Sequence, residues 1–291
     1  MNSALQDVLD LLDLEPIEVN LFRGRSPQED RQRVFGGQVL AQALVAAGRT
    51  VDDRHAHSLH AYFLRPGDPA VPILYEVDRI RDGKSFTTRR VVAVQHGRAI
   101  FNMSVPFQID EPGLEHQSPM PEVTDPETLP TQREHQLRLA EDAPDSYRHW
   151  FEREHAFEER TLNPINWFRP EKQAPQQRIW LKTSETLSDD QPLHQALLAY
   201  ASDMSLLDTS AMPHGVSFFD PEIQIASLDH AMWFHRPFRV DDWLLYVTDS
   251  PSTSNARGFN RGTIYARDGR LVASVVQEGL LRRTPGKPRE V

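Results

Sequence analysis

The chain has 291 residues, of which 39% are hydrophobic and 25% charged, a formal net charge of −10 and no cysteine. Without cysteine there is no disulfide, zinc–thiolate site, iron–sulfur cluster or thiol nucleophile. The acidic balance argues against a nucleic-acid partner, which needs a basic face. No apolar run reaches the ~18 to 20 residues that cross a bilayer, and the start is acidic, unlike a signal peptide. We therefore expect a cytoplasmic protein without a membrane span.

In chain order, the first predicted element is an amphipathic helix at residues 1–12, whose apolar stripe caps a core. Residues 14–24 lead into a first sheet, and a helix is expected at 36–48. Residues 112–155 are rich in proline and weakly periodic, which indicates a long connection with one helix near 131–140. In the second half, the apolar spacing predicts a helix at 193–207.

The last third of the chain has strand composition. β-Branched and aromatic residues are frequent at 240–248, 258–266 and 271–281, and one strand is expected over 223–233. The Asp268-Gly269 pair between the last two strands is a hairpin signal, as is His96-Gly97 in the first half.

An internal repeat organises these elements. SLHAYFLRP and HGRAIFNMSVPFQ in the first half match LDHAMWFHRP and DGRLVASVVQEG in the second, at one offset of ~170 to 172 residues. One long helix against an antiparallel sheet, repeated, is an α+β arrangement. We expect an N-terminal domain at 1–111, a connecting segment at 112–155 and a C-terminal domain at 156–291.

Three polar residues interrupt apolar rows in the second half. Asp203 borders the helix stripe, Ser227 follows two isoleucines on one strand face, and Gln277 ends an apolar row of the last strand. The repeat places Val45, Ala56 or His57, and Val105 at the corresponding positions of the first half, so none of the three groups is kept. This pattern favours a single working site in the C-terminal half.

Each residue also has an ordinary structural interpretation. Asp203 could point to solvent or to a nearby arginine, Ser227 could be a satisfied buried hydroxyl, and Gln277 could bond backbone at a strand end. An unpaired buried polar group costs ~1 to 3 kcal/mol, so both interpretations require partners for these side chains. The residues alone leave the choice open.

Beyond these residues, the sequence resembles the acyl-CoA thioesterase II family. The matching segments are VFGGQVLAQAL, HSLHAYFLRPGD, LAYASDM, IQIASLDHAMWFHRPF, ARGFNRG and LVASVVQEG. The resemblance implies a double hotdog, in which each half wraps a long central helix in an antiparallel sheet and the two sheets pair as a pseudo-dimer. It also implies a catalytic trio at Asp203, Ser227 and Gln277, with Ser227 standing where bacterial relatives often have threonine.

The chemistry implied by the resemblance is hydrolysis of acyl-CoA to free fatty acid and CoA. A water held by the trio attacks the thioester, a backbone N–H near a helix start meets the oxyanion, and neither a metal nor a cofactor is needed. For the CoA phosphates we expect the cations of Arg257, Arg261, Arg65 and Lys84, although solvated or ion-paired roles fit them too. Medium-to-long acyl chains are the expected substrates, and a homodimer or homotetramer the expected assembly.

Other classes of function remain as alternatives. A serine hydrolase would carry Gly-x-Ser-x-Gly, which is absent from the sequence. A metallohydrolase could use His55, His57 and His60, but His60 faces away from the other two on a strand. A hotdog hydratase would pair Asp229 with His230, which point oppositely as strand neighbours. A last alternative is a module that binds acyl-CoA without hydrolysing it; the intact trio argues against this role.

Overall fold

The computed structural model describes residues 2–27, 32–143 and 153–284. The helices are α1 (Ser3–Leu12), α2 (Gly36–Gly48), α3 (Gln132–Asp142), α5 (Gln191–Ser202) and α6 (Asp208–Ala211), with short 3-10 turns at Pro126–Thr128 and Met212–His214. The strands of the first half are β1 (Glu15–Glu18), β2 (Leu21–Gly24), β3 (His55–Ala56), β4 (Ser58–Phe63), β5 (Ile73–Asp82), β6 (Phe86–Gln95) and β7 (Arg98–Gln108). Those of the second half are β8 (Phe157–Thr161), β9 (Gln176–Thr183), β10 (Ile223–Ser227), β11 (Asp229–Phe234), β12 (Leu244–Ser254), β13 (Arg257–Ala266) and β14 (Leu271–Arg283).

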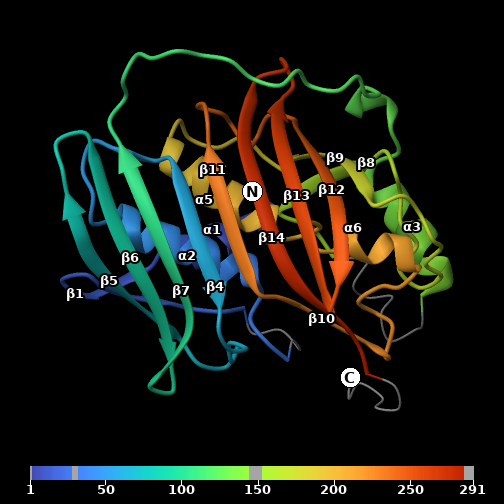
Figure 1. Ribbon diagram of the computed structural model, residues 1–291, viewed down its shortest axis with the longest axis horizontal. Helices are drawn as coiled ribbons and strands as arrows, with labels where there is room; N and C mark the ends of the chain where they lie inside the picture. Colours follow the sequence, from blue (N-terminus) through green and yellow to red (C-terminus); the bar gives the residue numbers. More distant parts are fainter. Residues whose placement is uncertain (1, 28–31, 144–152, 285–291) are drawn as a thin grey trace.

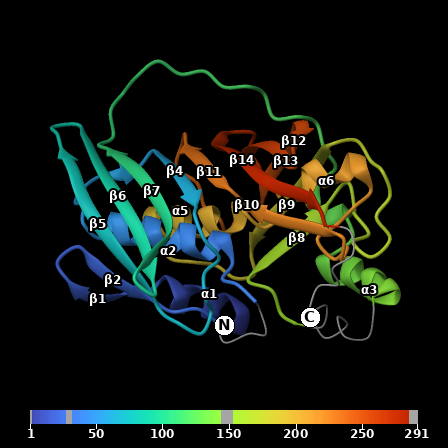
Figure 2. The same ribbon diagram turned by 60° about the horizontal axis from the view of Figure 1, so that its bottom comes forward.

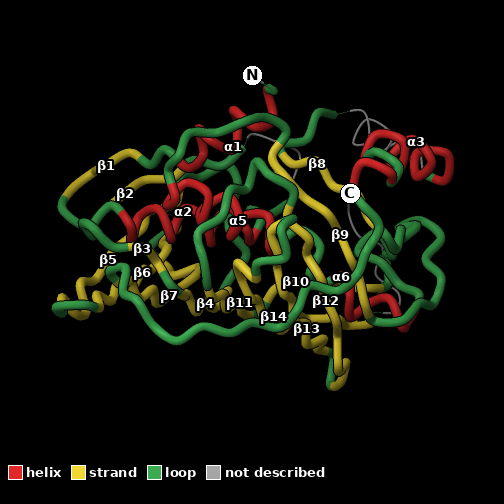
Figure 3. The backbone as a smooth tube through the Cα atoms, turned by 90° about the horizontal axis from the view of Figure 1, so that it is seen from above, coloured by secondary structure: helices red, strands yellow, loops and turns green. Residues whose placement is uncertain are grey.

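All the strands join one 14-stranded sheet (Figure 1). Its order is β1-β2-β5-β6-β7-β4-β11-β14-β13-β12-β9-β8, with β3 beside β7 and β10 beside β14. Neighbouring strands are antiparallel, and β4 pairs with β11 to join the two halves. Helices α1, α2 and α5 lie along one face of this sheet (Figure 3). This is the expected α+β double hotdog, with two central helices and two sheets that pair into a pseudo-dimer.

The internal repeat extends to the strand registers. In the first half β5 and β6 shift register between Arg79 and Arg81, and in the second half β12 and β13 shift between Asp249 and Ser252. A second shift, after Ala93, recurs after Ile264. Equal irregularities at equal offsets show that the two halves share one backbone pattern, because a β-bulge is a local feature of a particular strand pair.

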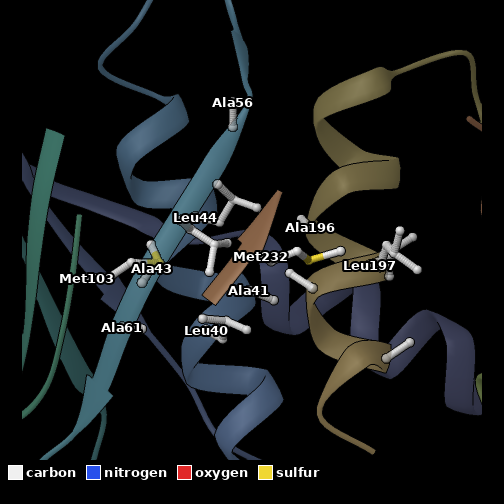
Figure 4. Packing of buried hydrophobic residues seen from close by; sticks show 14 of the residues in the cluster. Leu40, Ala41, Ala43, Leu44, Ala56, Ala61, Met103, Ala196, Leu197 and Met232 are labelled. Atoms are coloured by element: carbon white, nitrogen blue, oxygen red, sulfur yellow. The ribbon is translucent and has the colours of Figure 1, made fainter. Parts of the chain in front are cut away.

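The core lies between the helices and the sheet. Small residues let α2 and α5 approach each other, and Ala41, Ala43 and Ala196 are fully or almost fully buried. Leu40, Leu44 and Met232 fill the layer between these helices and the seam strands β4 and β11 (Figure 4). Burial of each large apolar side chain contributes roughly 1.5 to 3 kcal/mol, so this shared core holds the two halves together.

Most predicted elements are confirmed. Helix α1 buries Leu5, Val8 and Leu12, and α3 begins after the N-cap Thr131 with a capping box. His96 and Gly97 both have positive φ, as a tight hairpin turn requires. The connection between the halves passes the strand ends (green in Figure 2). Within this connection, the Gln117 side chain forms hydrogen bonds with the backbone of Gly269 and Leu271.

The helix predicted at 193–207 is wrong at its C-terminal end. It ends at Ser202, with Asp203 as the C-cap residue, and Met204 is 37% exposed rather than part of the buried stripe. Tyr246 donates a hydrogen bond to the Ser202 carbonyl, which satisfies one of the acceptors left at the helix end. A tertiary contact therefore stops the helix where apolar spacing alone would continue it.

The single strand predicted over residues 223–233 is also wrong, because it is broken at Leu228. Ser227 pairs with Gly279, but Ala231 pairs with Val276, so the register slips by one residue between β10 and β11. Leu228 bonds Glu278 on one side and Phe63 on the other. The break reverses which residues face the helices, since the inward residues of β11 have even numbers and those of β10 odd numbers.

Candidate active site

Asp203 lies at the centre of a buried polar site. Asp203 is the residue directly after α5, and it is only 8% exposed. Gln277 Nε2 donates to Asp203 Oδ1 at 2.6 Å, and Ser227 Oγ donates to the same oxygen at 3.1 Å. The structure thus brings together the three residues that the sequence singled out.

Two different strands supply the partners of Asp203. Gln277 is fully buried on the helix-facing side of β14, and Ser227 is the last residue of β10, directly before the break at Leu228. The two strands are neighbours in the sheet. A side chain at the end of α5 can therefore accept from both strands at once.

The first half contributes the start of α2. The backbone N–H of Gly37 lies close enough to Asp203 to lower the pKa of its carboxyl group, and a Cβ added at Gly36 would lie 2.6 Å from Asp203 Oδ2. Gly37 packs equally closely, because an added Cβ would lie 2.4 Å from the Tyr200 carbonyl oxygen. The N-terminus of a helix carries a partial positive charge, which favours an anion at this point. The site therefore lies between the two halves.

Burial and hydrogen bonding act on Asp203 in opposite directions. Loss of hydration is the larger effect, and bonds from Gln277, Ser227 and Gly37 offset part of it, leaving the pKa of Asp203 raised to about 6. At neutral pH the carboxylate is ionised, yet it binds a proton far more readily than an exposed aspartate. These are the properties of a general base.

Four further residues border the site, and sequence reasoning named only His230 among them, as the partner of Asp229 in the hydratase alternative. The Gly36-Gly37 pair is visible in the sequence as GGQ at the start of a helix, but only the fold places it against Asp203. His230 Nδ1 lies 4.0 Å from Asp203 Oδ1. Asn260 is fully buried and pairs across the sheet with Gln277. No sequence pattern distinguishes these two from ordinary core residues.

The corresponding place in the first half is chemically different. The strand registers pair Arg89 with Val105 where the second half pairs Asn260 with Gln277. Arg89 is 2% exposed, and it donates to Thr50, to backbone carbonyls and to Asp82. A buried guanidinium with partners on all its nitrogens fills this region.

The structure shows which first-half residues correspond to the trio. Ala56, which pairs with Phe107 in the strand register, corresponds to Ser227, which pairs with Gly279, so the alternative His57 is not needed. Val105 corresponds to Gln277, as expected. Val45, the predicted counterpart of Asp203, lies inside α2, whereas Asp203 is the C-cap residue of α5; the C-cap residue of α2 is Arg49.

The four cations predicted for CoA lie apart from one another. Arg257 pairs with Glu278 at 2.8 Å, and Arg261 pairs with Asp249 on the exposed face of the sheet. Arg65 follows β4 and donates to the Ala99 carbonyl. Lys84 is exposed in the turn between β5 and β6, beside Arg54, at the opposite end of β4 from Arg65.

The Arg261–Asp249 pair has a counterpart in the first half. Arg90 pairs with Asp78 at 3.1 Å, in the same strands and at the same offset. The recurrence favours a structural cross-strand role for this ion pair, since the first half lacks the trio. Both pairs are solvent-exposed and contribute little to stability.

The histidines of the metallohydrolase alternative do not converge. His60 packs edge-on against Trp233, and His57 packs against Phe86. Over the described ranges, no group of three or more His, Asp or Glu side chains is arranged to hold a metal ion. In the same ranges no helix is long and apolar enough to cross a membrane.

Two fused hotdog halves with one polar site between them define the chain as a double-hotdog protein. Its residues 25–108 match the model of the acyl-CoA thioesterase N-terminal domain, and residues 146–280 match the acyl-CoA thioesterase model. The chain therefore belongs to the acyl-CoA thioesterase family.

Individual relatives agree over the full length. The chain is 39% identical to acyl-CoA thioesterase 2 of Haemophilus influenzae, with 97% of this chain and 99% of that one covered. It is 41% identical to mouse acyl-coenzyme A thioesterase 8, with 96% of this chain and 89% of that one covered. The crystal structure of an acyl-CoA thioesterase II from Mycobacterium marinum superimposes with a TM-score of 0.79 at 42% identity, covering 96% of this chain and all of that one.

Proposed function

We propose that the chain hydrolyses acyl-CoA thioesters to free fatty acid and CoA, using a water activated by Asp203. The observation that carries the proposal is the buried Asp203 carboxylate, bonded by Gln277 and Ser227 and facing the start of α2. Names of relatives at about 40% identity over the whole chain agree with this reaction.

The roles of the residues follow from their atoms. Gln277 and Ser227 hold Asp203 Oδ1, so the second carboxylate oxygen is left to orient a water and take its proton. The thioester carbonyl is electrophilic enough for this water to attack it directly. The oxyanion that forms is stabilised by a backbone N–H at the start of α2, where the helix dipole favours negative charge.

The same step accounts for the leaving group. As the tetrahedral intermediate collapses, the C–S bond breaks and CoA departs as a thiolate. Asp203 then releases the proton that it took from water, either to this thiolate or to solvent. The step requires no metal and no cofactor, because the carboxylate supplies the base and the helix start supplies the electrophilic assistance.

The finer features of the function are also proposals. Medium-to-long acyl chains are the proposed substrates, and Arg65, Arg257, Arg261 and Lys84 are the proposed cations for the CoA phosphates. We also propose domains at 1–111 and 156–291 joined by 112–155, a cytoplasmic location and a homo-oligomer.

Thiol release from acyl-CoAs of increasing chain length tests this function. Wild-type protein is expected to release CoA from medium and long chains with turnover that resists a chelator, and Ser227→Thr to remain active while Ser227→Ala loses activity. A folded protein that binds acyl-CoA but releases no thiol would replace hydrolysis with a binding role. Loss of turnover on chelation would revive a metal-dependent mechanism.

A further inference from the structure

His230 lies beside Asp203 and has one ring nitrogen without a partner. It is fully buried on β11, and its Nδ1 lies 4.0 Å from Asp203 Oδ1. Within the described residues, Nδ1 has no hydrogen-bond partner. An unsatisfied buried polar atom is costly, so its position next to the carboxyl group of the site requires a physical reason.

The other ring nitrogen determines where the imidazole proton lies. Nε2 lies 3.0 Å from Ser202 Oγ, and Ser202 Oγ donates its only proton to the Ala199 carbonyl at 2.9 Å. Ser202 can therefore only accept from His230, which requires a proton on Nε2. Burial lowers the pKa of His230 to about 3, so the ring is neutral and carries one proton. Nδ1 then presents a lone pair to Asp203.

We propose that His230 is a positioning residue whose Nδ1 accepts a hydrogen bond from Asp203 after Asp203 has taken the proton of the attacking water. This inference rests on the proposed function. When Asp203 is ionised, two acceptors face each other and stay 4.0 Å apart. The proton of the water arrives on Oδ2, so the carboxyl group turns about its Cβ–Cγ bond and exchanges the places of its two oxygens. Its O–H can then donate to Nδ1 and the gap can close. Hydrogen bonds used in catalysis are often long in the free enzyme and shorten during the reaction.

The proton balance of this step is simple. Asp203 gains one proton from water and keeps it while bonded to His230, and the same proton later leaves with the CoA thiolate or to solvent. His230 gains and loses none. Its contribution is to stabilise the protonated form of Asp203, which strengthens Asp203 as a base at the moment of attack.

Few other titratable groups act on Asp203. In the described part of the chain, Tyr246 on β12 interacts with its charge, and burial raises the pKa of this tyrosine well above the ordinary value. Gln277, Ser227 and the Gly37 N–H are neutral donors from β14, β10 and α2. In the same part of the chain, Gln277 Oε1 and Asn260 Oδ1 are also buried acceptors without a partner. The Gln277 amide already donates to Asp203 Oδ1, and His230 Nδ1 lies 4.0 Å from that oxygen.

Two substitutions separate the two sides of the imidazole. In His230→Asn the amide oxygen can occupy the place of Nδ1, which faces Asp203, whereas in His230→Gln the amide reaches the place of Nε2, which faces Ser202. The Gln variant is expected to lose about tenfold in kcat, with the acidic limb of its pH profile about 0.5 to 1 pH unit lower and KM unchanged. In the Asn variant kcat should fall by less, and the midpoint of the acidic limb should stay at its wild-type pH.

A second buried histidine serves as control. His194 has both ring nitrogens occupied, one by the Val240 N–H and the other near the Ser188 carbonyl. His194→Gln should lower the melting temperature without moving the midpoint of the pH profile. Equal losses in the two His230 variants, or a smaller loss in the Gln variant, would overturn the proposal and leave a structural role through Ser202.

A measurement without substrate keeps this inference separate from the proposed function. Nitrogen-15 NMR of labelled histidine should show His230 protonated on Nε2, and carbon-13 NMR of Asp203 should show a lower pKa in the Gln variant than in wild type. A proton on Nδ1, or an unchanged Asp203 pKa, would contradict the inference. If the wild type releases no thiol, the proposed function fails, whereas these two NMR results still decide how His230 acts on Asp203.

Discussion

At the scale of single residues, the site depends on a carboxylate that is ionised although it is buried. Desolvation raises the pKa of Asp203 to about 6, and three hydrogen-bond donors prevent it from rising further. A weaker base would be less able to take a proton from water, and a stronger one would already be protonated at neutral pH. The hydrogen-bond donors of the site therefore keep the pKa of Asp203 between these two extremes.

The first prediction concerns the pH dependence of turnover. Because Asp203 must be ionised in the free enzyme, kcat/KM should fall about tenfold per pH unit below pH ~6 and be level above pH ~7. Thiol release at constant ionic strength measures the profile. An acyl-pantetheine substrate, which lacks the CoA phosphates, is the control and should give the same limb. A limb near pH 4 with both substrates would assign the base elsewhere.

The second prediction concerns stability. The folded-state pKa of Asp203 is raised above the ordinary value of 3.8, so its contribution to stability is greatest at low pH and is lost as pH rises through about 6. Asp203→Asn should therefore raise the free energy of unfolding by roughly 1 to 2 kcal/mol at pH 8, and the gain should disappear near pH 4. Urea unfolding at the two pH values measures the difference. A gain that is equal at both values would contradict the assigned shift.

At the scale of elements, the site is formed by the meeting of the start of α2, the end of α5, the end of β10 and the middle of β14. Helix α2 begins with two glycines because any side chain there would collide with Asp203 or with the Tyr200 carbonyl of α5. The break between β10 and β11 lets Ser227 reach Asp203 while Met232 faces the core. Small local irregularities thus decide where the polar groups lie.

A matched pair of glycine substitutions tests the role of the α2 start. Gly36→Ala places a Cβ 2.6 Å from Asp203 Oδ2 and should lower kcat by about 100-fold, because the carboxylate must move. Gly48→Ala, at the other end of the same helix, meets no atom within 4 Å and should leave kcat unchanged. Circular dichroism checks that both variants fold. Equal activity in the two variants would remove the start of α2 from the site.

The sequence predicted the elements better than their ends. The apolar stripe placed α1, the internal repeat indicated α2, and β-branched composition with a hairpin signal placed the last two strands; the helix expected near 131–140 is α3. The end of α5 and the break at Leu228 depend on Tyr246, Glu278 and Phe63, which are distant in the chain. The trio was visible in the sequence as polar interruptions of apolar rows, whereas the positions of His230 and Asn260 beside Asp203 depend on the fold and were not.

At the scale of the whole molecule, the two halves share a backbone pattern, but only the second half carries the trio. The halves share registers and bulges, yet Arg89 and Val105 stand where Asn260 and Gln277 stand in the second half. The second half supplies the trio, and the first half supplies the start of α2. Both halves are therefore needed for the single site.

The whole-molecule prediction is that Arg89 stabilises the first half without acting in catalysis. Arg89→Met removes the buried cation that donates to Thr50 and to backbone carbonyls. The substitution should lower the free energy of unfolding by about 2 to 4 kcal/mol. Below the melting temperature, kcat should be unchanged. Arg90→Met breaks only an exposed ion pair and should cost less than about 1 kcal/mol. A fall in kcat specific to Arg89→Met would indicate a second functional site.

The most direct test of the central claim is thiol release by Asp203→Asn beside the wild type, at saturating long-chain acyl-CoA and pH 8. The Asn side chain keeps the shape of Asp203 and can still accept from Gln277, but it cannot take a proton from water. The account predicts a folded variant that binds acyl-CoA with little change in affinity and has lost roughly 100-fold or more of kcat. Turnover within a few-fold of wild type would show that another group activates the water.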